Sequence, residues 1–179
     1  ELIDPLQEAS GYLARQSPWR VLIVPFELVL PDSWFRPFSS IGVWVLVALV
    51  VWRIRGVLPR PSGMANDPSA SAVWAATALS LAWLLSSTYA LAWYDVIVWA
   101  PLAMLSASRL DLVLLARTAT VAVAYAPGLD IDPPGSLGSV TTFLSGTLAP
   151  LVDLALLLVV LFGGRRLRLP PRVESQSPA

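Results

Sequence analysis

The chain contains no cysteine and no histidine. It contains no lysine either, since all twelve of its basic residues are arginine. Without cysteine it can form no disulfide, thiolate nucleophile or cysteine-bound zinc site. Without histidine it lacks the usual general base, the Ser-His-Asp triad and the commonest ligand of transition metals. Without lysine it can form neither a Schiff base nor a Walker loop. Any catalysis must therefore use aspartate or glutamate, alone or with a hard metal ion.

Charge is scarce as well. Charged residues make up 13% of the 179 residues, and a typical soluble domain has about twice that share. Hydrophobic residues make up 56%, and the mean hydropathy is +0.67. Twelve arginines balance twelve acids, so the chain has no basic excess for binding nucleic acid. Since so few charges cannot cover a soluble globule, the composition predicts a protein whose apolar side chains face lipid.

Apolar stretches predict an all-α transmembrane bundle over residues 37–162, with about five spans. A helix needs about 20 apolar residues to cross the hydrocarbon core. Four stretches approach or meet this length and a fifth is shorter. None of them alternates like a barrel strand, so the predicted spans are helices. These spans are Pro37–Trp52, Ser71–Leu91, Val96–Ala107, Leu110–Ala126 and Val140–Phe162.

The arginines predict an orientation in the plasma membrane. Arginine follows the first, third and fifth spans, whereas the charged residues of loops 91–95 and 127–139 are all acidic. By the positive-inside rule, the arginine-bearing loops and the 163–179 tail are cytoplasmic and the N-terminus lies outside. We expect residues 1–36 to form an amphipathic or re-entrant outer segment, with Trp19, Trp34 and Phe35 at headgroup depth. A sixth span is the alternative for this segment.

The densest cluster of functional groups falls between the second and third predicted spans, in the run SSTYALAWYD. The carboxylate of Asp95, flanked by Tyr89 and Tyr94, could accept hydrogen bonds from sugar hydroxyls, while the ring of Trp93 could stack on a sugar face. Two structural interpretations stay open beside this one. Aromatic rings favour the membrane interface in any case, and Asp95 could simply cap the third span.

The run YALAWYDVIVWAPL, from Tyr89 to Leu102, resembles a motif of a known enzyme family. The motif is a Pro-Trp-Tyr sequence followed by an apolar helix, late in actinobacterial polytopic glycosyltransferases of the C superfamily. These include the polyprenyl-phosphomannose-dependent α-1,6-mannosyltransferases. The SPWR sequence ending at Arg20, the following helices and the arginine-rich end look like the C-terminal half of such proteins. One departure is that Ala92 stands where the family usually has proline.

The resemblance implies an integral-membrane enzyme that transfers a sugar, mannose in the members named, from polyprenyl phosphate to a cell-envelope glycan. The family's catalytic base is an acid in the first outer loop, which we do not find here. Because Glu1 follows no initiator methionine, we expect the chain to be part of a longer protein that carries this base in a missing N-terminal half. The residues expected to contact donor or acceptor are Tyr89, Trp93, Tyr94, Asp95 and Arg20.

Two other function classes stay open. A non-catalytic membrane scaffold or assembly subunit is favoured by the lack of any complete catalytic constellation. A lipid or solute transporter is favoured by the intramembrane charges Arg117 and Asp153, together with proline in the third and fifth spans. We expect Arg117 and Asp153 to form a structural ion pair, because an unpaired charge in lipid is costly.

The loop LDIDPPG places two carboxylates, Asp130 and Asp132, two residues apart. Such a pair could hold Mg²⁺ or Ca²⁺ beside a donor phosphate. The loop is short, however, and supplies no third ligand. We favour a solvated turn, and a divalent cation is the alternative.

Overall fold

The computed structural model describes residues 17–27, 32–61, 64, 66–88, 92–125 and 136–167. Over these residues the protein is all-α, as predicted, and forms six helices when α7, a π-helical turn and α8 are counted as one. The elements, in chain order, are α2 (Pro18–Glu27), α3 (Asp32–Ile54), α4 (Pro68–Ser86), the 3-10 turn η1 (Ala92–Tyr94), α5 (Asp95–Leu102), α6 (Arg109–Tyr125), α7 (Ser136–Phe143), the π-helical turn η2 (Leu144–Leu148), α8 (Ala149–Gly163) and the 3-10 turn η3 (Gly164–Leu167).

By length and composition, two of these helices could cross a membrane. One is α4, and the other is the continuous 26-residue helix Gly138–Gly163. The apolar part of α3, Phe38–Ile54, is shorter. The third predicted span, Val96–Ala107, is wrong as a spanning helix, because α5 has only 8 residues and is about 12 Å long.

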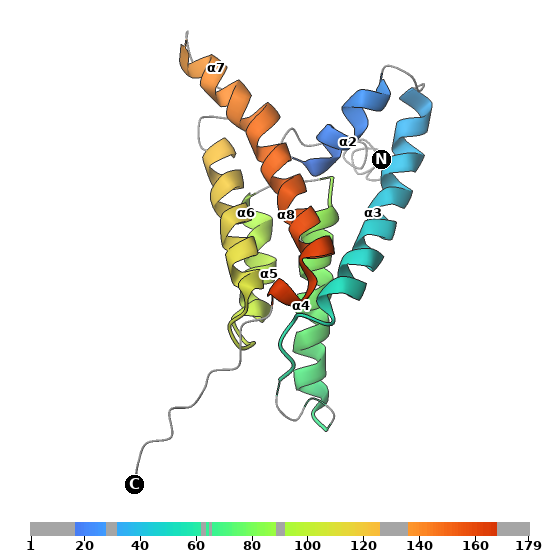
Figure 1. Ribbon diagram of the computed structural model, residues 1–179, viewed down its shortest axis with the longest axis vertical. Helices are drawn as coiled ribbons and strands as arrows, with labels where there is room; N and C mark the ends of the chain where they lie inside the picture. Colours follow the sequence, from blue (N-terminus) through green and yellow to red (C-terminus); the bar gives the residue numbers. More distant parts are fainter. Residues whose placement is uncertain are drawn as a thin grey trace, which may run out of the picture.

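The helix formed by α7 and α8 lies at the centre of the arrangement (Figure 1). Its α8 part contacts α2, α3, α4 and α6. In Figure 1, α3 and α7 diverge toward one end of the molecule, and α2 lies between them there. The opposite end contains the C-terminal ends of α3 and α8 and the start of α6. We call it the arginine end, because it carries Arg53, Arg55 and Arg109.

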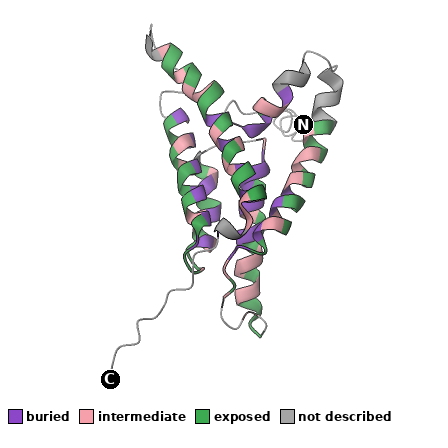
Figure 2. Cartoon of the chain, viewed as in Figure 1, coloured by how far each residue is buried: buried purple, intermediate pink, exposed green. Residues whose placement is uncertain are grey.

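Aliphatic side chains fill the interior where α3, α4, α6 and α8 meet. Figure 2 shows buried residues on the inward faces of these helices and exposed residues on the outward faces. The outward faces are nevertheless apolar: Trp44 is 68% exposed and Phe162 is 75% exposed. A bundle with an apolar exterior is what the composition predicts for a protein in lipid. The large aliphatic side chains that are fully buried in the described part of the chain are those of Val50, Ile54, Leu81, Leu84, Val98, Leu110, Leu114, Val121, Leu157 and Val160.

The ends of α4 are set by local hydrogen bonds. At its start, the Asp67 carboxylate accepts hydrogen bonds from the Ser69 backbone N–H (2.9 Å) and hydroxyl (2.6 Å), and Pro68 occupies the first helical position. These are common helix N-terminal signals. The predicted second span continues to Leu91, whereas α4 ends at Ser86. Side chains of α2 and its preceding residue satisfy the carbonyl groups that this ending leaves without intrahelical partners.

Pro101 and Ser108 separate α5 from α6. Proline donates no backbone hydrogen bond, and α5 ends one residue after Pro101. Ser108 then starts α6 with a reciprocal pair of contacts: its hydroxyl accepts from the Leu110 N–H, and its own N–H donates to Asp111. This capping box gives Asp111 a structural role at the first turn of α6.

The last predicted span, Val140–Phe162, lies within one longer continuous helix, Ser136–Gly163. The helix widens at η2, where the Ala149 N–H donates to the Leu144 carbonyl, five residues back. In a regular helix, the Pro150 ring would clash with the carbonyl four residues earlier. A π-helical turn accommodates the proline without breaking the helix. The helix ends at Gly163, and the next residue, Gly164, has a φ of +46°, which glycine adopts readily.

Trp19 fixes α2 against the rest of the bundle. Its indole N–H donates to the Ser86 carbonyl at 2.7 Å, and the Ser17 hydroxyl donates to the Ser87 carbonyl at 3.1 Å. Trp19 is therefore buried against the end of α4, and its place at headgroup depth stays a prediction. On its other side the ring lies against Gly42 of α3, where any β-carbon would overlap it. The side chains of Trp34 and Phe35 lie outside the described residues.

We predict that Gly42→Ala lowers the stability of the protein. The added methyl group would force the Trp19 ring out of its site, and overpacking of this kind costs about 1–3 kcal/mol. Thermal unfolding in detergent would measure the effect. Gly146→Ala is the matched control, because a β-carbon at Gly146 meets nothing within 4 Å. Equal melting temperatures for the two variants would refute the contact.

The N-terminal cap of α4 predicts a pH dependence. Hydrogen bonds from the Ser69 side chain and backbone lower the pKa of Asp67 from its usual 3.8. A lowered pKa in the folded state means that the cap stabilises fully above pH 3.8, and that this contribution is lost as the pH falls through the lowered pKa. The melting temperature of the wild type should therefore fall more steeply in acid than that of Asp67→Asn. Parallel curves for the two proteins would contradict this role of Asp67.

Candidate functional site

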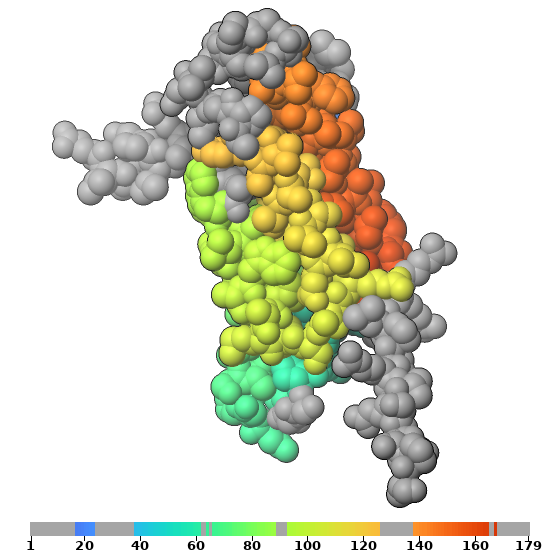
Figure 3. Space-filling view, turned by 90° about the vertical axis from the view of Figure 1, so that its left-hand side faces the viewer, coloured from blue at the N-terminus to red at the C-terminus, as the bar shows by residue number. Residues whose placement is uncertain are grey.

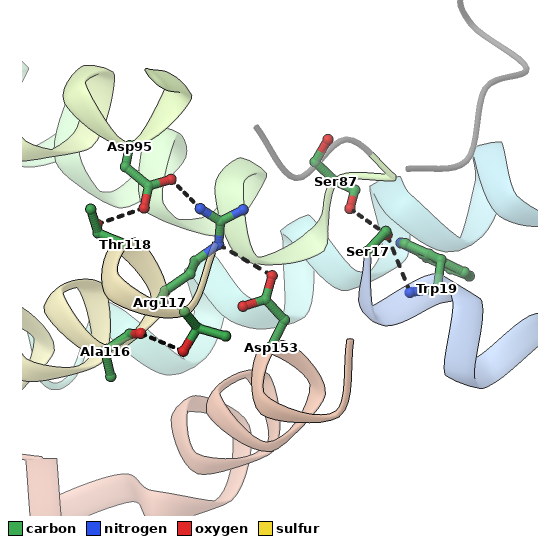
Figure 4. A network of polar contacts seen from close by, with 9 residues as sticks. Ser17, Trp19, Ser87, Asp95, Ala116, Arg117, Thr118 and Asp153 are labelled. Carbon is green, nitrogen blue, oxygen red and sulfur yellow. Dashed lines mark hydrogen bonds and ion pairs between the residues drawn. The ribbon is translucent and has the colours of Figure 1, made fainter. Parts of the chain in front are cut away.

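Three charged side chains from three helices meet in the interior of the bundle (Figure 4). Arg117 comes from α6, Asp95 is the first residue of α5, and Asp153 lies on α8. An Arg117 Nη1–Asp95 Oδ1 ion pair joins α6 to α5, and Arg117 Nε lies 3.6 Å from Asp153 Oδ2. None of the three side chains is more than 3% exposed. We call this group the buried triad.

The second carboxylate oxygen of Asp95 also has a hydrogen-bond partner. It accepts a hydrogen bond of 2.6 Å from the Thr118 hydroxyl, and that hydroxyl accepts one of 3.2 Å from the Trp99 indole N–H. Trp99 lies on α5 and Thr118 on α6, so this chain of hydrogen bonds joins the same two helices as the ion pair. Asp95 is thereby held by a cation and a hydroxyl at once, which is how a buried carboxylate is usually stabilised.

Asp153 is held less completely than Asp95. Neither of its carboxylate oxygens accepts a hydrogen bond from the described residues, and Arg117 Nε donates none. At 3.6 Å the contact between them is an ion pair without a hydrogen bond. Arg117 therefore makes its stronger contact with Asp95 and stabilises Asp153 by charge alone.

The sequence predicts Arg117 and Asp153 as partners, and the structure brings them together. It also adds Asp95, which the sequence instead places at an outer mouth, open to sugar hydroxyls. That placement of Asp95 is wrong, because its side chain is 1% exposed. Arg117 is eight residues from the start of α6, about 12 Å into the bundle from the arginine end. Asp95 lies at the same depth as its partner.

Aromatic rings gather beside the buried triad, and we call the group of Trp83, Trp93, Tyr94 and Tyr125 the aromatic corner. Trp93 makes edge contacts with Tyr94 and Tyr125, with ring centroids 6.3 and 5.3 Å apart. Tyr94 also meets Trp83 of α4 edge-on at 5.7 Å. The rings come from α4, η1 and α6, so the corner links three elements. Trp93 is nevertheless 52% exposed.

The other predicted site residues are not brought into this group. Arg20 is exposed on α2, and Tyr89, Asp130 and Asp132 lie outside the described residues. Within the described part of the chain, no three His, Cys, Asp or Glu side chains are grouped so that they could hold a metal ion. The divalent cation considered from the sequence therefore has no support from the residues whose positions are known.

Sequence reasoning missed Thr118, Trp99 and Ser17. Thr118 donates a hydrogen bond to Asp95, Trp99 donates one to Thr118, and Ser17 fixes the end of α4. Thr118 directly follows Arg117, but adjacent helix residues usually face different neighbours. A hydroxyl next to a buried charge is therefore a weak sequence signal. The Thr118 and Trp99 contacts join the consecutive helices α5 and α6, and the Ser17 contact joins residues 70 positions apart.

Comparisons with protein-family models, with curated proteins and with solved structures find no match for this chain. Function must therefore be inferred from the residues and their geometry. The buried triad is a structural feature with no open reactive group, whereas the aromatic corner exposes a ring. The two features suggest different roles.

We predict that Arg117→Leu is strongly destabilising, by about 3–5 kcal/mol, because it leaves two buried carboxylates without a cation. Arg60→Leu, which removes an exposed arginine, should have little effect. The measurement is thermal or denaturant unfolding in detergent. Removing a carboxylate as well, in Arg117→Leu/Asp95→Leu or Arg117→Leu/Asp153→Leu, should recover part of the loss. In the two double-mutant cycles, the coupling free energy of Arg117 with Asp95 should exceed that of Arg117 with Asp153, because Asp95 is the closer partner. Strictly additive effects in both pairs would show that the triad does not act as a unit.

Proposed function

We propose that this chain is the membrane-embedded part of a glycosyltransferase that takes a sugar from a polyprenyl-phosphate donor. The observation that carries the proposal is the half-exposed Trp93 ring in the aromatic corner. It lies in the run that resembles the family motif, and it is supported by the rings of Tyr94, its neighbour in η1, and Tyr125 of α6. An exposed aromatic ring on a rigid support offers a flat apolar face with little loss of conformational entropy on binding. A sugar ring has C–H groups that fit such a face.

In this proposal Asp95 is a positioning residue. Its carboxylate holds the start of α5 on α6 through Arg117 and Thr118. Tyr94 and Trp93 precede it directly, so the same contacts fix the turn η1 that presents the two rings. Asp95 thus acts on substrate through the rings and does not contact sugar hydroxyls itself.

The proposed catalytic base belongs to another part of the whole protein. Among the described residues, Asp95 and Asp153 are buried with Arg117, Asp111 caps α6 and Asp67 caps α4. Each of these acids therefore already has a structural contact. This arrangement fits the expectation that the family's base lies in a first outer loop, with the present helices forming the wall beside it.

We also propose that the chain passes the membrane five times, with the arginine end in the cytoplasm. Helices α3, α4, α6 and the α7–α8 helix would each cross it. The third passage would include α5, which is too short to cross alone, together with the turn η1 before it. At the end of α4, Ser87 is buried and its carbonyl accepts a hydrogen bond from the Ser17 hydroxyl. This backbone carbonyl is therefore satisfied within the protein, as a membrane interior requires.

A non-catalytic scaffold subunit is the second candidate. The observation that favours it is the engagement of every described buried acid in a contact between helices. Such a subunit would need the triad for assembly and would have no use for an exposed ring in the aromatic corner. The two candidates therefore differ in what they require of Trp93.

Trp93→Ala should lower sugar transfer per folded molecule by at least about tenfold, because the substrate would lose a contact with the exposed ring worth about 1–2 kcal/mol. The assay uses labelled sugar on polyprenyl phosphate and membranes that contain the whole gene product. Trp44→Ala is the matched control, because Trp44 is equally large and 68% exposed on α3. If both variants transfer sugar at the wild-type rate, the scaffold function is favoured.

A further inference from the structure

An apolar groove opens at the arginine end of the bundle, on the side where α6 begins and α8 ends. Figure 3 shows the start of α6, in yellow, against the end of α8, in red. The groove has a volume of about 540 Å³. It is lined by Arg109, Leu158, Val159, Phe162, Gly163 and Leu167.

The walls of the groove are hydrophobic and outward-facing. Phe162 is 75% exposed, and Leu158 and Val159 are each 44% exposed, while Leu167 is buried. Leu158 lies one helical turn before Phe162, about 6 Å farther from the arginine end. The apolar surface therefore extends from the mouth of the groove toward the middle of the membrane proposed above. It has the direction that an acyl chain would take.

Arginine side chains gather at the mouth of the groove. Arg109 contributes its side chain to the lining. Two more guanidinium groups belong to the same end: that of Arg53 donates to the Leu161 carbonyl, and that of Arg55 lies 5.9 Å from the centre of the Trp52 ring. The one described acid on the first turn of α6, Asp111, accepts a hydrogen bond from the Ser108 N–H. Cations at one end and hydrocarbon along the length match an amphiphile with a negative head.

We propose that this groove binds an anionic phospholipid of the cytoplasmic leaflet. The phosphate pairs with the Arg109 guanidinium, and one acyl chain lies along Phe162, Val159 and Leu158. Basic pockets between helices at the cytoplasmic face are a recurrent kind of acidic-lipid site. A free phosphate would use only the charge, and a zwitterionic lipid would lack the net negative charge. The inference rests on the membrane embedding proposed above, but not on sugar transfer.

The test measures the binding of lipids to the full chain purified in detergent, with the shift in melting temperature and native mass spectrometry as readouts. Phosphatidylglycerol should stabilise the protein and stay bound, whereas phosphatidylcholine and inorganic phosphate should not. Arg109→Gln should weaken phosphatidylglycerol binding at least about fivefold, as expected for one basic residue near an anionic head. Arg60→Gln is the control, because Arg60 is exposed and does not line the groove.

A second variant keeps the test informative if Arg109→Gln does not fold. Val159→Trp would fill the groove and should abolish lipid retention, while Val140→Trp, at an exposed site on α7 outside the groove, should not. Equal binding of both lipids, or wild-type binding by Val159→Trp, would overturn the lipid site. Stabilisation by inorganic phosphate alone would identify a simple anion site and also overturn it. A chain that stays monodisperse without detergent would instead overturn the membrane embedding itself.

Discussion

Arg117 makes the contacts on which the interior of this bundle depends. Its guanidinium lies between Asp95 of α5 and Asp153 of α8, so one side chain of α6 joins three helices. In a low-dielectric interior these charges must be paired, because an isolated one would cost several kcal/mol. The pairing fixes which faces of the three helices meet. Aliphatic packing alone would specify those faces less sharply, since apolar side chains tolerate many alternative contacts.

The same contacts connect the interior to the exposed surface. Asp95 begins α5, and the two residues before it carry the rings of Trp93 and Tyr94. Because Asp95 is fixed by Arg117 and Thr118, the rings are presented at a defined place beside Tyr125. A buried structural group and an exposed binding group thus occupy adjacent positions in the chain. The contacts of the Asp95 carboxylate hold the start of α5 in place, and the proposed recognition of sugar uses the rings of the two residues before it.

The two ends of the bundle have different surface chemistry. Rings collect at the aromatic corner, whereas guanidinium groups and an apolar groove lie at the arginine end. This asymmetry suits a protein that meets a sugar donor on one side of a membrane and acidic lipid on the other.

Much of the local structure could be predicted from the sequence. Long apolar runs predicted helices, and α6 was predicted within one residue at each end. Arg117 and Asp153 could be paired because both are charges in apolar segments, and a charge in such a place needs a partner. The C-terminal end of α4 could not be predicted in this way. It depends on Ser17 and Trp19, which act through contacts with residues far away in the chain.

The sequence by itself determined that the protein is helical and apolar, where its charges lie along the chain, and which of its ends is rich in arginine. These properties follow from composition and from the spacing of residues, which do not change on folding. Only the tertiary structure decided that Asp95 is buried with Arg117 while its neighbour Trp93 is exposed. Both residues stand in one polar and aromatic run, and nothing local distinguishes them. They differ because Arg117, the charge partner of Asp95, lies on α6, and the ion pair between them holds the Asp95 carboxylate in the interior.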